Sequence, residues 1–510
     1  MKSIGVVLAI LCGAAALALP GIAHADTGFQ GPSYPAGSSG PPTTSKPESK
    51  LWWNDGFWWA SMYDGTGTYR IFRLNLRAQR WVNTGVVIDP RGSTRQDVLS
   101  TGSRLFVASH KYQPVTAEDP TPDPDKDGMR LYRFSYNAAQ NRYTLNSGSP
   151  QTINPQRAEA LVIDRDSNGV LWATWVQQSG GQHHVFVART TGNCVGGTIV
   201  NCAWDAPTQL ATVGADDISS IVRFGGNKVG VMWSDTPASQ ILFSVHNDDD
   251  PIGTWSSPEV VIGGAKRAED HINLKADAAG RVYAVTKTKF TSSANPGTML
   301  HRRTVSGTWT NHTVSIASLR RTRPIVLVDT QHNAIRVYES EGRAVYLKKS
   351  RLSPISFPTH RAGTAVIRDT GSSVANPTST KQVISNTTRL IVLATNDQTN
   401  RYWHSYQQII PCIRGTARRN VLIGTRGNDV ICGRGGADTI RTLGGNDRLI
   451  GGPGRDRLVG GSGRDAFLGG GGNDRLFSRD NKREVVNGGR GFDRARVNAS
   501  DVRRSIERLL

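Results

Sequence analysis

The sequence is poor in cysteine and in acidic residues, and it has few long apolar runs. Its 510 residues include 5 cysteines, and 41 acidic residues stand against 61 basic ones. Beyond the first 25 residues no segment is long and apolar enough to span a bilayer. The patterns Gly-x-Ser-x-Gly and His-Glu-x-x-His and the phosphate-binding loop are missing. These absences argue against a polytopic membrane protein and against the hydrolases and nucleotide-binding enzymes that those patterns identify.

The N-terminus has the pattern of a secretory signal. Lys2 precedes the apolar run Ile4–Leu19, and Ala23-His24-Ala25 forms a small-x-small cleavage pattern before Asp26. A membrane anchor is the alternative, but the run is short and no stop-transfer pattern follows it. We therefore expect residues 1–25 to be removed and the mature protein to be secreted, extracellular and without a transmembrane segment. Residues 26–50 are rich in Pro, Ser, Gly and Thr, which predicts a flexible leader.

Four cysteines remain after the signal, and an even number in an exported chain suggests disulfides. Cys194 and Cys202 flank a glycine-rich turn, which favours a hairpin bridge between them. Cys412 would then pair with Cys432. No Cys-x-x-Cys metal spacing is present.

The formal net charge is +20, and the stretch from Arg414 onward holds 20 basic and 11 acidic residues. Nucleic-acid binding is one interpretation of so basic a chain. The sequence has no recognisable reading helix and no dense Lys/Arg stretch, so we expect no specific nucleic-acid partner. Attraction to acidic glycans or to cell-surface polyanions fits an exported protein better.

Residues 51–410 are predicted to form an all-β domain. Runs of β-branched and aromatic residues alternate with Gly, Asn and Asp turns. Seven apolar hairpins recur, at Leu51–Met62, Asp97–Ser109, Ala160–Trp175, Ser219–Trp233, Ile272–Thr286, Pro324–Tyr338 and Lys381–Thr395. Further strands follow most hairpins, which predicts a β-propeller of six or seven blades, because radial stacking protects strand edges. An array of β-sandwiches is the alternative.

Residues 411–510 contain a repeat with a period of nine. An aspartate, a glycine and an apolar residue each recur every nine residues over six copies. The aspartates are Asp429, Asp438, Asp447, Asp456, Asp465 and Asp474; the glycines two residues earlier are Gly427, Gly436, Gly445, Gly454, Gly463 and Gly472; the apolar residues two later are Ile431, Ile440, Leu449, Leu458, Phe467 and Leu476. Glycine permits tight loops, and aspartate supplies the hard anionic oxygen that Ca²⁺ prefers. Each unit would form half a coil, so that aspartates 18 residues apart stack with an ion between their loops.

These residues resemble the RTX, or haemolysin-type, calcium-binding repeat family. The resemblance covers residues 420–477 and implies a parallel β-roll that orders when it binds Ca²⁺, with a cap at its C-terminal end. A further copy, Gly488–Asp493, follows out of register. Arginines lie in or beside the loops, at Arg426, Arg434, Arg448, Arg455, Arg457, Arg464 and Arg475, and we expect their charge to weaken calcium binding. A glycine–aspartate coil without metal is the alternative.

Two acidic turns in the propeller region are further metal candidates. Asp123, Asp125 and Asp127 precede Gly128 in a D-x-D-x-D-G pattern, whose alternate carboxylates can converge on one cation. Asp164–Gly169 is a similar D-x-D-x-N-G turn. Neither has the glutamate of an EF-hand, and an ordinary solvated turn is the alternative for each.

Charged residues recur just before or within the first strand of several blades. The candidates for a catalytic or ligand-binding site at the mouth of the central channel are Arg95, Asp97, Arg157, Glu159, Arg267, Glu269 and Arg323, accompanied by Asp216, Asp217, Asp270, His271 and Arg321. Arginines can hold a carboxylate bidentately, and a nearby acid can transfer a proton. The alternative is a network of structural ion pairs that closes the channel.

A predicted propeller with this arrangement of charged residues resembles the sialidase superfamily. Such enzymes bind the sugar carboxylate with three arginines and use an acid/base Asp and a Tyr–Glu pair. Tyr69–Phe72 has a trace of their Arg-Ile-Pro segment, and Ser244–Trp255 and Gly307–Trp309 have traces of their Asp-box. The sequence therefore predicts a secreted calcium-binding protein whose propeller recognises glycans; the alternative is a sialidase-like glycoside hydrolase or lyase. Trp52, Trp53, Trp58 and Trp59 are interpreted as blade core rather than a sugar-stacking platform.

Overall fold

The computed structural model describes residues 28–35, 42–43, 47–112, 123, 125–291, 293–330, 332–384, 390–407, 413–427, 429–478 and 480–510. The predicted signal, residues 1–25, lies outside this range. Within it the chain is built from β-strands and two short 3-10 helices, η1 (Ile199–Cys202) and η2 (Ala317–Leu319). No helix in the described ranges is long and apolar enough to cross a membrane.

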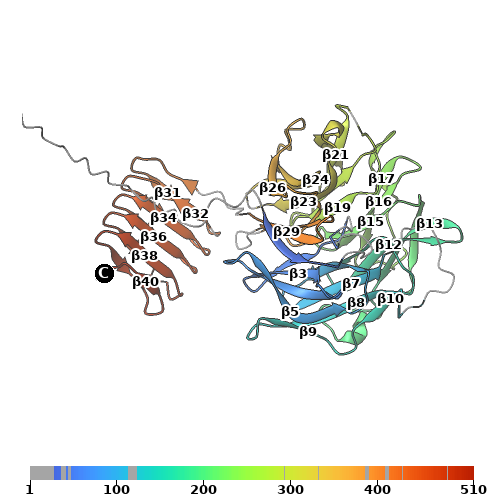
Figure 1. The fold of residues 1–510 in the computed structure, drawn as a ribbon, viewed down its shortest axis with the longest axis horizontal. Helices are drawn as coiled ribbons and strands as arrows, with labels where there is room; N and C mark the ends of the chain where they lie inside the picture. Colours follow the sequence, from blue (N-terminus) through green and yellow to red (C-terminus); the bar gives the residue numbers. More distant parts are fainter. Residues whose placement is uncertain are drawn as a thin grey trace, which may run out of the picture.

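The first body is a β-propeller with seven blades, which resolves the choice between six and seven (Figure 1). Blade 1 has β2 (Leu51–Asn54), β3 (Phe57–Tyr63), β4 (Tyr69–Asn75) and β5 (Arg80–Asp89). Blade 2 has β6 (Thr94–Ser100), β7 (Arg104–Lys111), β8 (Met129–Asn137), β9 (Arg142–Leu145) and β10 (Gln151–Asn154). Blade 3 has β11 (Leu161–Arg165), β12 (Leu171–Ser179), β13 (Gln182–Arg189) and β14 (Thr208–Val213).

The remaining blades repeat this antiparallel order. Blade 4 has β15 (Ser219–Phe224), β16 (Lys228–Asp235), β17 (Gln240–Asn247) and β18 (Glu259–Gly263). Blade 5 has β19 (Ile272–Ala276), β20 (Val282–Lys287), β21 (Pro296–Arg303) and β22 (Trp309–Ile316). Blade 6 has β23 (Thr322–Asp329), β24 (Ala334–Glu341), β25 (Ala344–Arg351) and β26 (Thr364–Arg368). Blade 7 has β27 (Ala375–Thr378), β28 (Leu390–Asn396), β29 (Arg401–Gln407) and, from the other end of the chain, β1 (Phe29–Ser33).

Strand β1 closes the ring, and here the structure differs from the expected flexible leader. β1 pairs with β29 as the outer strand of blade 7, so the two ends of the propeller sequence share one sheet. Pro32 fits because an edge strand need not donate every ladder hydrogen bond. Glu48 and Lys50, also in this segment, are fully buried and form an ion pair of 2.7 Å. The inner strand of blade 7 likewise begins at Ala375 rather than at the predicted Lys381.

Apolar faces of neighbouring blades form the propeller core. Trp52, Trp58 and Trp59 are almost fully buried, as their interpretation as blade core requires. The predicted Cys194–Cys202 bridge is formed. Cys412 lies outside the described residues, so its predicted bridge to Cys432 is not described.

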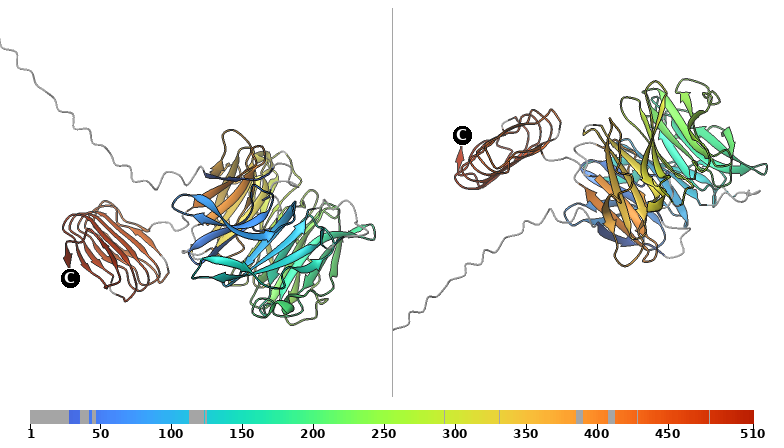
Figure 2. Two further views of the ribbon diagram at one scale, coloured as in Figure 1. Left: turned by 60° about the horizontal axis from the view of Figure 1, so that its bottom comes forward. Right: turned by 90° about the horizontal axis from the view of Figure 1, so that it is seen from above.

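The second body is the predicted parallel β-roll, with two six-stranded sheets (Figures 1 and 2). The first sheet has β30 (Ile413–Arg414), β32 (Val430–Cys432), β34 (Arg448–Pro453), β36 (Ala466–Gly471), β38 (Val485–Arg490) and β40 (Val502–Arg504). The second has β31 (Val421–Ile423), β33 (Thr439–Arg441), β35 (Arg457–Val459), β37 (Arg475–Phe477), β39 (Arg494–Arg496) and β41 (Arg508–Leu509).

Consecutive nine-residue units alternate between the two sheets, so residues 18 apart pair in register, as Ile431 does with Leu449. The repeated apolar residues face each other between the sheets and form one buried core: Ile431, Ile440, Leu449, Leu458, Phe467, Leu476, Val486 and Ala495. The nine-residue period thus places every aspartate just before a strand, at the bend between the two sheets.

Candidate calcium ladder and propeller pocket

The repeat aspartates stack in two columns that are held by hydrogen bonds to the backbone. The amide N–H of Asp429 donates to Oδ1 of Asp447 at 2.7 Å, and that of Asp447 donates to Oδ1 of Asp465 at 2.8 Å. In the other column, Asp438 donates to Asp456 at 2.7 Å and Asp456 donates to Asp474 at 2.8 Å. These four links join the pairs that the sequence predicts.

The second carboxylate oxygen of these aspartates, Oδ2, takes no part in the hydrogen bonds between repeats. Oδ2 is buried and has no hydrogen-bond partner among the described residues in Asp438, Asp447, Asp456, Asp465 and Asp474. A buried anionic oxygen without a donor is costly unless a cation meets it. The same oxygen lies against loop backbone, since a Cβ on Gly451 would come within 2.3 Å of Oδ2 of Asp456.

Glycine is required where successive loops stack. Gly454 has φ +152°, and a Cβ there would lie 1.8 Å from the carbonyl oxygen of Gly436. Gly463 is in the same position against the carbonyl of Gly445, at 1.9 Å. Loop carbonyls and aspartate oxygens therefore lie close together in the stack, and this oxygen-only donor set fits Ca²⁺.

Burial gives these aspartates abnormal acidity. It raises the pKa of Asp447 and of Asp456 to about 6, and the pKa of Asp465 and of Asp474 to about 7. The charge of the neighbouring ladder aspartate adds to the effect in each case. A divalent cation between the loops would offset both causes and keep the carboxylates ionised.

The ladder continues beyond the six regular repeats. Asp493, in the copy that is out of register in the sequence, accepts the amide N–H of Asp474 at 2.8 Å. The extra residue is accommodated after β37, where Glu484 takes the aspartate position before β38. Both oxygens of Glu484 are buried without a hydrogen-bond partner in the part of the chain that the structure describes. Burial and the charges of Asp501 and Asp480 raise the pKa of Glu484 to about 9.

The seven arginines expected to weaken calcium binding are all exposed to solvent. Water screens their charges from the buried carboxylates. Their effect on calcium affinity is therefore smaller than the sequence alone suggests.

In the propeller, the three aspartates of the first acidic turn have separate partners. Asp123 pairs with Lys126 at 3.0 Å, and Asp125 pairs with Arg130 at 3.2 Å. Asp127 pairs with Arg157 at 2.5 Å, so a predicted catalytic residue and a predicted metal ligand neutralise each other. In the second turn, Asp166 accepts backbone N–H groups of its own turn and the indole N–H of Trp172, as an ordinary structural turn does.

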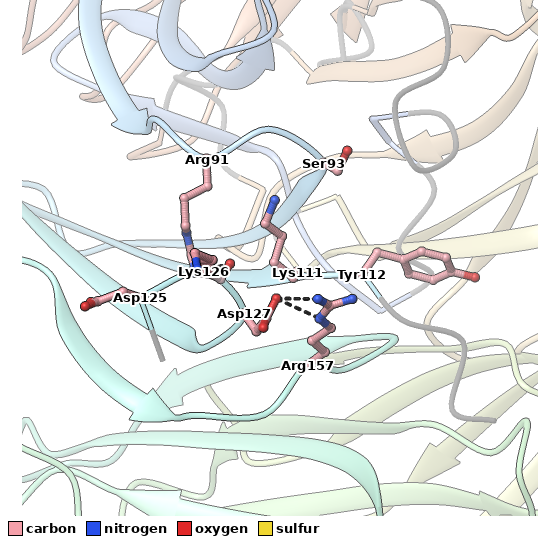
Figure 3. A pocket seen from close by; sticks show the side chains of 8 residues that line it. All are labelled: Arg91, Ser93, Lys111, Tyr112, Asp125, Lys126, Asp127 and Arg157. Atoms are coloured by element: carbon pink, nitrogen blue, oxygen red, sulfur yellow. Dashed lines mark hydrogen bonds and ion pairs between the residues drawn. The ribbon is translucent and has the colours of Figure 1, made fainter. Parts of the chain in front are cut away.

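A pocket of about 500 Å³ opens beside the first turn (Figure 3). Four cations line it, Arg91, Lys111, Lys126 and Arg157, together with Asp125, Asp127, Ser93 and Tyr112. Burial, and after it the charge of Arg91, lowers the pKa of Lys111. The sequence prediction considered charged residues just before or within the inner strand of a blade. It therefore missed Arg91, Lys111 and Tyr112, which lie at the ends of β5 and β7.

Three of the predicted residues, Arg95, Glu159 and Arg323, lie near enough to one another to interact electrostatically. Arg95 lies over the ring of Tyr112, with its guanidinium carbon 3.5 Å from the ring centre. Burial lowers the pKa of Arg323, and Arg95 and Glu159 are close enough to contribute to the shift. Arg323 has a left-handed backbone, φ +51°, and its Nη1 is buried without a partner among the described residues. Tyr112 also lines the pocket, so Arg95 lies next to one wall of it.

The other candidates lie apart. Asp97 is buried inside the channel, where it pairs with Lys381 and accepts the amide N–H groups of Ser49 and Ile163. This is the structural ion pair that the sequence left open as an alternative. Burial raises the pKa of Asp97 despite the nearby Lys381.

Arg267 and Glu269 lie at blade 5. The guanidinium of Arg267 lies 5.7 Å from the ring centre of Phe290. Burial alone would raise the pKa of Glu269, but His271 and Lys287 lower it to about 2, so it is a poor general acid near neutral pH. Glu269, Asp270 and His271 place one ligand atom each within 4.8 Å of one another, but His271 and Lys287 already pair with the acids.

The roll matches a family model, and the propeller is similar in fold to solved structures. Residues 414–449 and 441–476 match the model of the RTX calcium-binding nonapeptide repeat. No curated protein matches the chain. Among solved structures the chain is similar to an ulvan lyase, a polysaccharide lyase bound to -[GlcA(1-4)Rha3S]-, at 12% identity over 74% of this chain and 96% of that chain, with a TM-score of 0.51.

Two further similar structures are a polysaccharide lyase (10% identity, 76% of this chain, 98% of that chain, TM-score 0.44) and a Hadza microbial sialidase (9% identity, 69% of this chain, 73% of that chain, TM-score 0.34). At these identities the likeness concerns the fold alone, and the ulvan lyase match supports the propeller. Residues 414–476 of this chain are RTX calcium-binding repeats, and they follow a seven-bladed β-propeller.

Proposed function

We propose that this is an exported protein that binds calcium in its roll and an acidic polysaccharide in the propeller pocket. The observation that carries the proposal is a pocket lined by four cations, three of which are paired with acids (Arg91 with Asp89, Lys126 with Asp123 and Arg157 with Asp127), while Lys111, among the described residues, donates only to a backbone carbonyl. The volume of the pocket, about 500 Å³, is in the range of ligand sites. Arginine and lysine form strong charge-assisted hydrogen bonds with anionic groups such as the carboxylates of an acidic sugar chain.

Two elements position these cations. Arg91 is held by Asp89, at 2.8 Å, and donates to the carbonyl of Gly128. Lys111 ends β7 and donates to the carbonyl of Gly92. Since neither side chain can move far, the positive charge is fixed before a ligand arrives, which lowers the entropy cost of binding.

Cleavage of the bound sugar, as a hydrolase or a lyase, is the second candidate. It is favoured by the contact of Arg95 with Tyr112 and by the electrostatic influence of Arg95, Glu159 and Tyr112 on Arg323. The two arginines would neutralise a uronate carboxylate, and Tyr112 or Glu159 would transfer a proton. Appearance of unsaturated or reducing-end products from an acidic polysaccharide, and its loss in Tyr112→Phe, would support cleavage over binding alone.

The binding proposal is tested with the full chain and chondroitin sulfate by isothermal calorimetry in EGTA, where the roll holds no calcium. The double variant Arg91→Gln/Lys111→Gln should bind at least about tenfold more weakly, because each charge-assisted hydrogen bond contributes about 1.5–3 kcal/mol. Arg80→Gln, which removes an exposed charge outside the pocket, is the control and should bind as the parent does. Equal binding by the double variant and the parent would refute the pocket as the site.

A further inference from the structure

The second sheet of the roll carries a column of arginines on its outer face. In register, Arg457 pairs with Arg475, Arg475 with Arg494, and Arg494 with Arg508. The residues that follow the first three, Leu458, Leu476 and Ala495, are buried, so the arginines point away from the core. We call Arg457, Arg475, Arg494 and Arg508 the arginine ladder.

The equivalent column of the first sheet is different. Arg448 is followed in register by Ala466, Val485 and Val502. In both columns each residue directly follows the stacked Asp or Glu of its repeat. The repeat itself therefore does not require arginine at this position. At this position the second sheet therefore carries arginine on four successive strands, whereas the first sheet carries one arginine followed by three apolar residues.

Stability does not explain the arginine ladder. Strands in a sheet lie about 4.8 Å apart, and like charges on paired positions destabilise the sheet. No strand of the second sheet contains an acidic residue. In the described part of the chain none of the four arginines forms a side-chain ion pair, and Arg457 instead lies over the ring of Phe477 at 4.2 Å. Four unneutralised cations in single file are the arrangement that a linear polyanion would neutralise.

We propose that the arginine ladder binds a linear acidic polysaccharide lengthwise, and that calcium switches this binding on. The arginines are aligned only by the parallel register of the coiled roll, and the stacked aspartates oppose coiling until a cation neutralises them. The switch rests on the calcium-binding function of the roll, whereas the ladder is separate from the propeller pocket.

A polysaccharide fits this surface better than a nucleic acid does. The ladder is straight and one residue wide, whereas duplex phosphates wind around a helix and would touch it over a short arc only. Single-stranded nucleic acid is usually held by stacking on aromatic rings, and the ring of Phe477 is already covered by Arg457. An extended sugar chain with an anionic group on successive units can follow the column from one strand to the next.

The test compares two triple variants of the full chain that remove the same charge. The ladder variant, Arg457→Gln/Arg475→Gln/Arg494→Gln, removes three of the four charges of the arginine ladder. The first-sheet variant, Arg448→Gln/Arg490→Gln/Arg504→Gln, removes three exposed arginines from the first sheet. Affinity for chondroitin sulfate is measured by calorimetry in calcium and in EGTA, at two salt concentrations. Circular dichroism in calcium verifies that both variants coil.

The parent should bind more tightly in calcium than in EGTA. The ladder variant should lose that gain, with affinity in calcium falling at least tenfold, while the first-sheet variant should lose less than threefold. Equal losses in the two variants, or no calcium-dependent gain in the parent, would overturn the proposal. Displacement of the polysaccharide by duplex DNA at equal charge concentration would identify nucleic acid as the partner and would also overturn it. Binding in EGTA reports the propeller pocket alone, so failure of the ladder and failure of the pocket are seen separately.

Discussion

At the scale of single residues, the charged side chains of the roll lie where its repeat places them, whereas those of the propeller are positioned by contacts between distant strands. A period of nine fixes Asp447 beside Asp465 because each unit is half a coil, and the hydrogen bond between them has that spacing. Asp97 and Arg323 look alike in the sequence, as charges near the start of an inner strand. Only packing between distant strands decides that Asp97 is buried and paired with Lys381, whereas Arg323 lies near Arg95 and Glu159.

The raised pKa values of the stacked aspartates lead to a prediction about pH. In the metal-free roll the pKa of Asp465 and of Asp474 is about 7, above the ordinary value of 3.8. The native state then binds protons that the unfolded chain has released, so stability is fully present below about pH 4 and is lost as pH rises through about 7. Scanning calorimetry of the full chain in EGTA should show the roll transition moving to lower temperature between about pH 5 and pH 8.

Calcium should reverse this trend, because it competes with protons for the same oxygens. In saturating calcium the roll transition should move to higher temperature over the same pH range. Asp474→Asn, which keeps the shape of a protonated aspartate, should flatten the trend in EGTA and weaken calcium binding. If the temperature of the roll transition in EGTA rose with pH, this account of the stacked aspartates would be contradicted.

At the scale of elements, repeated hairpins were predictable and the closing strand was not. Blades 1 to 6 begin with the hairpins that the apolar runs indicate. Strand β1 has a Gly and a Pro among its five residues and no apolar alternation, so local sequence does not favour a strand there. Its pairing with β29 is a contact between the two ends of the propeller sequence, which no local pattern can reveal.

The loop glycines provide an element-level prediction with a matched control. Gly472 has φ +123°, and a Cβ there would lie 1.8 Å from the carbonyl oxygen of Gly454. Its neighbour Gly471 has no atom within 4 Å of such a Cβ. Gly472→Ala should therefore destabilise the calcium-loaded roll by about 2 kcal/mol or more, since it forces the stacked loops apart.

Gly471→Ala should change the stability of the roll by about 0.5 kcal/mol or less. Chemical denaturation in calcium, followed by circular dichroism, compares the two variants with the parent. Equal losses in both would mean that the loops are not stacked as described.

At the scale of the whole molecule, the order of the two bodies could be read from the sequence because the period and the glycine content change near residue 411. The all-β class and the propeller followed from hairpin recurrence, and the roll followed from its repeat. The propeller pocket did not, since it combines the ends of β5 and β7 with the segments that precede β8 and β11. The arginine ladder also emerges only at this scale, where the nine-residue spacing becomes a column along one sheet.

Hydrogen–deuterium exchange of the full chain, with and without calcium, tests the central claim most directly. If calcium orders the roll, peptides from residues 413–510 should gain strong protection when calcium is added, while peptides from residues 51–407 should exchange equally in both conditions. Asp456→Asn should reduce the gain around the second-sheet loops, where Asp456 links Asp438 to Asp474. Roll peptides that are equally protected in calcium and in EGTA would contradict the account, because the coil would then be stable without the ion.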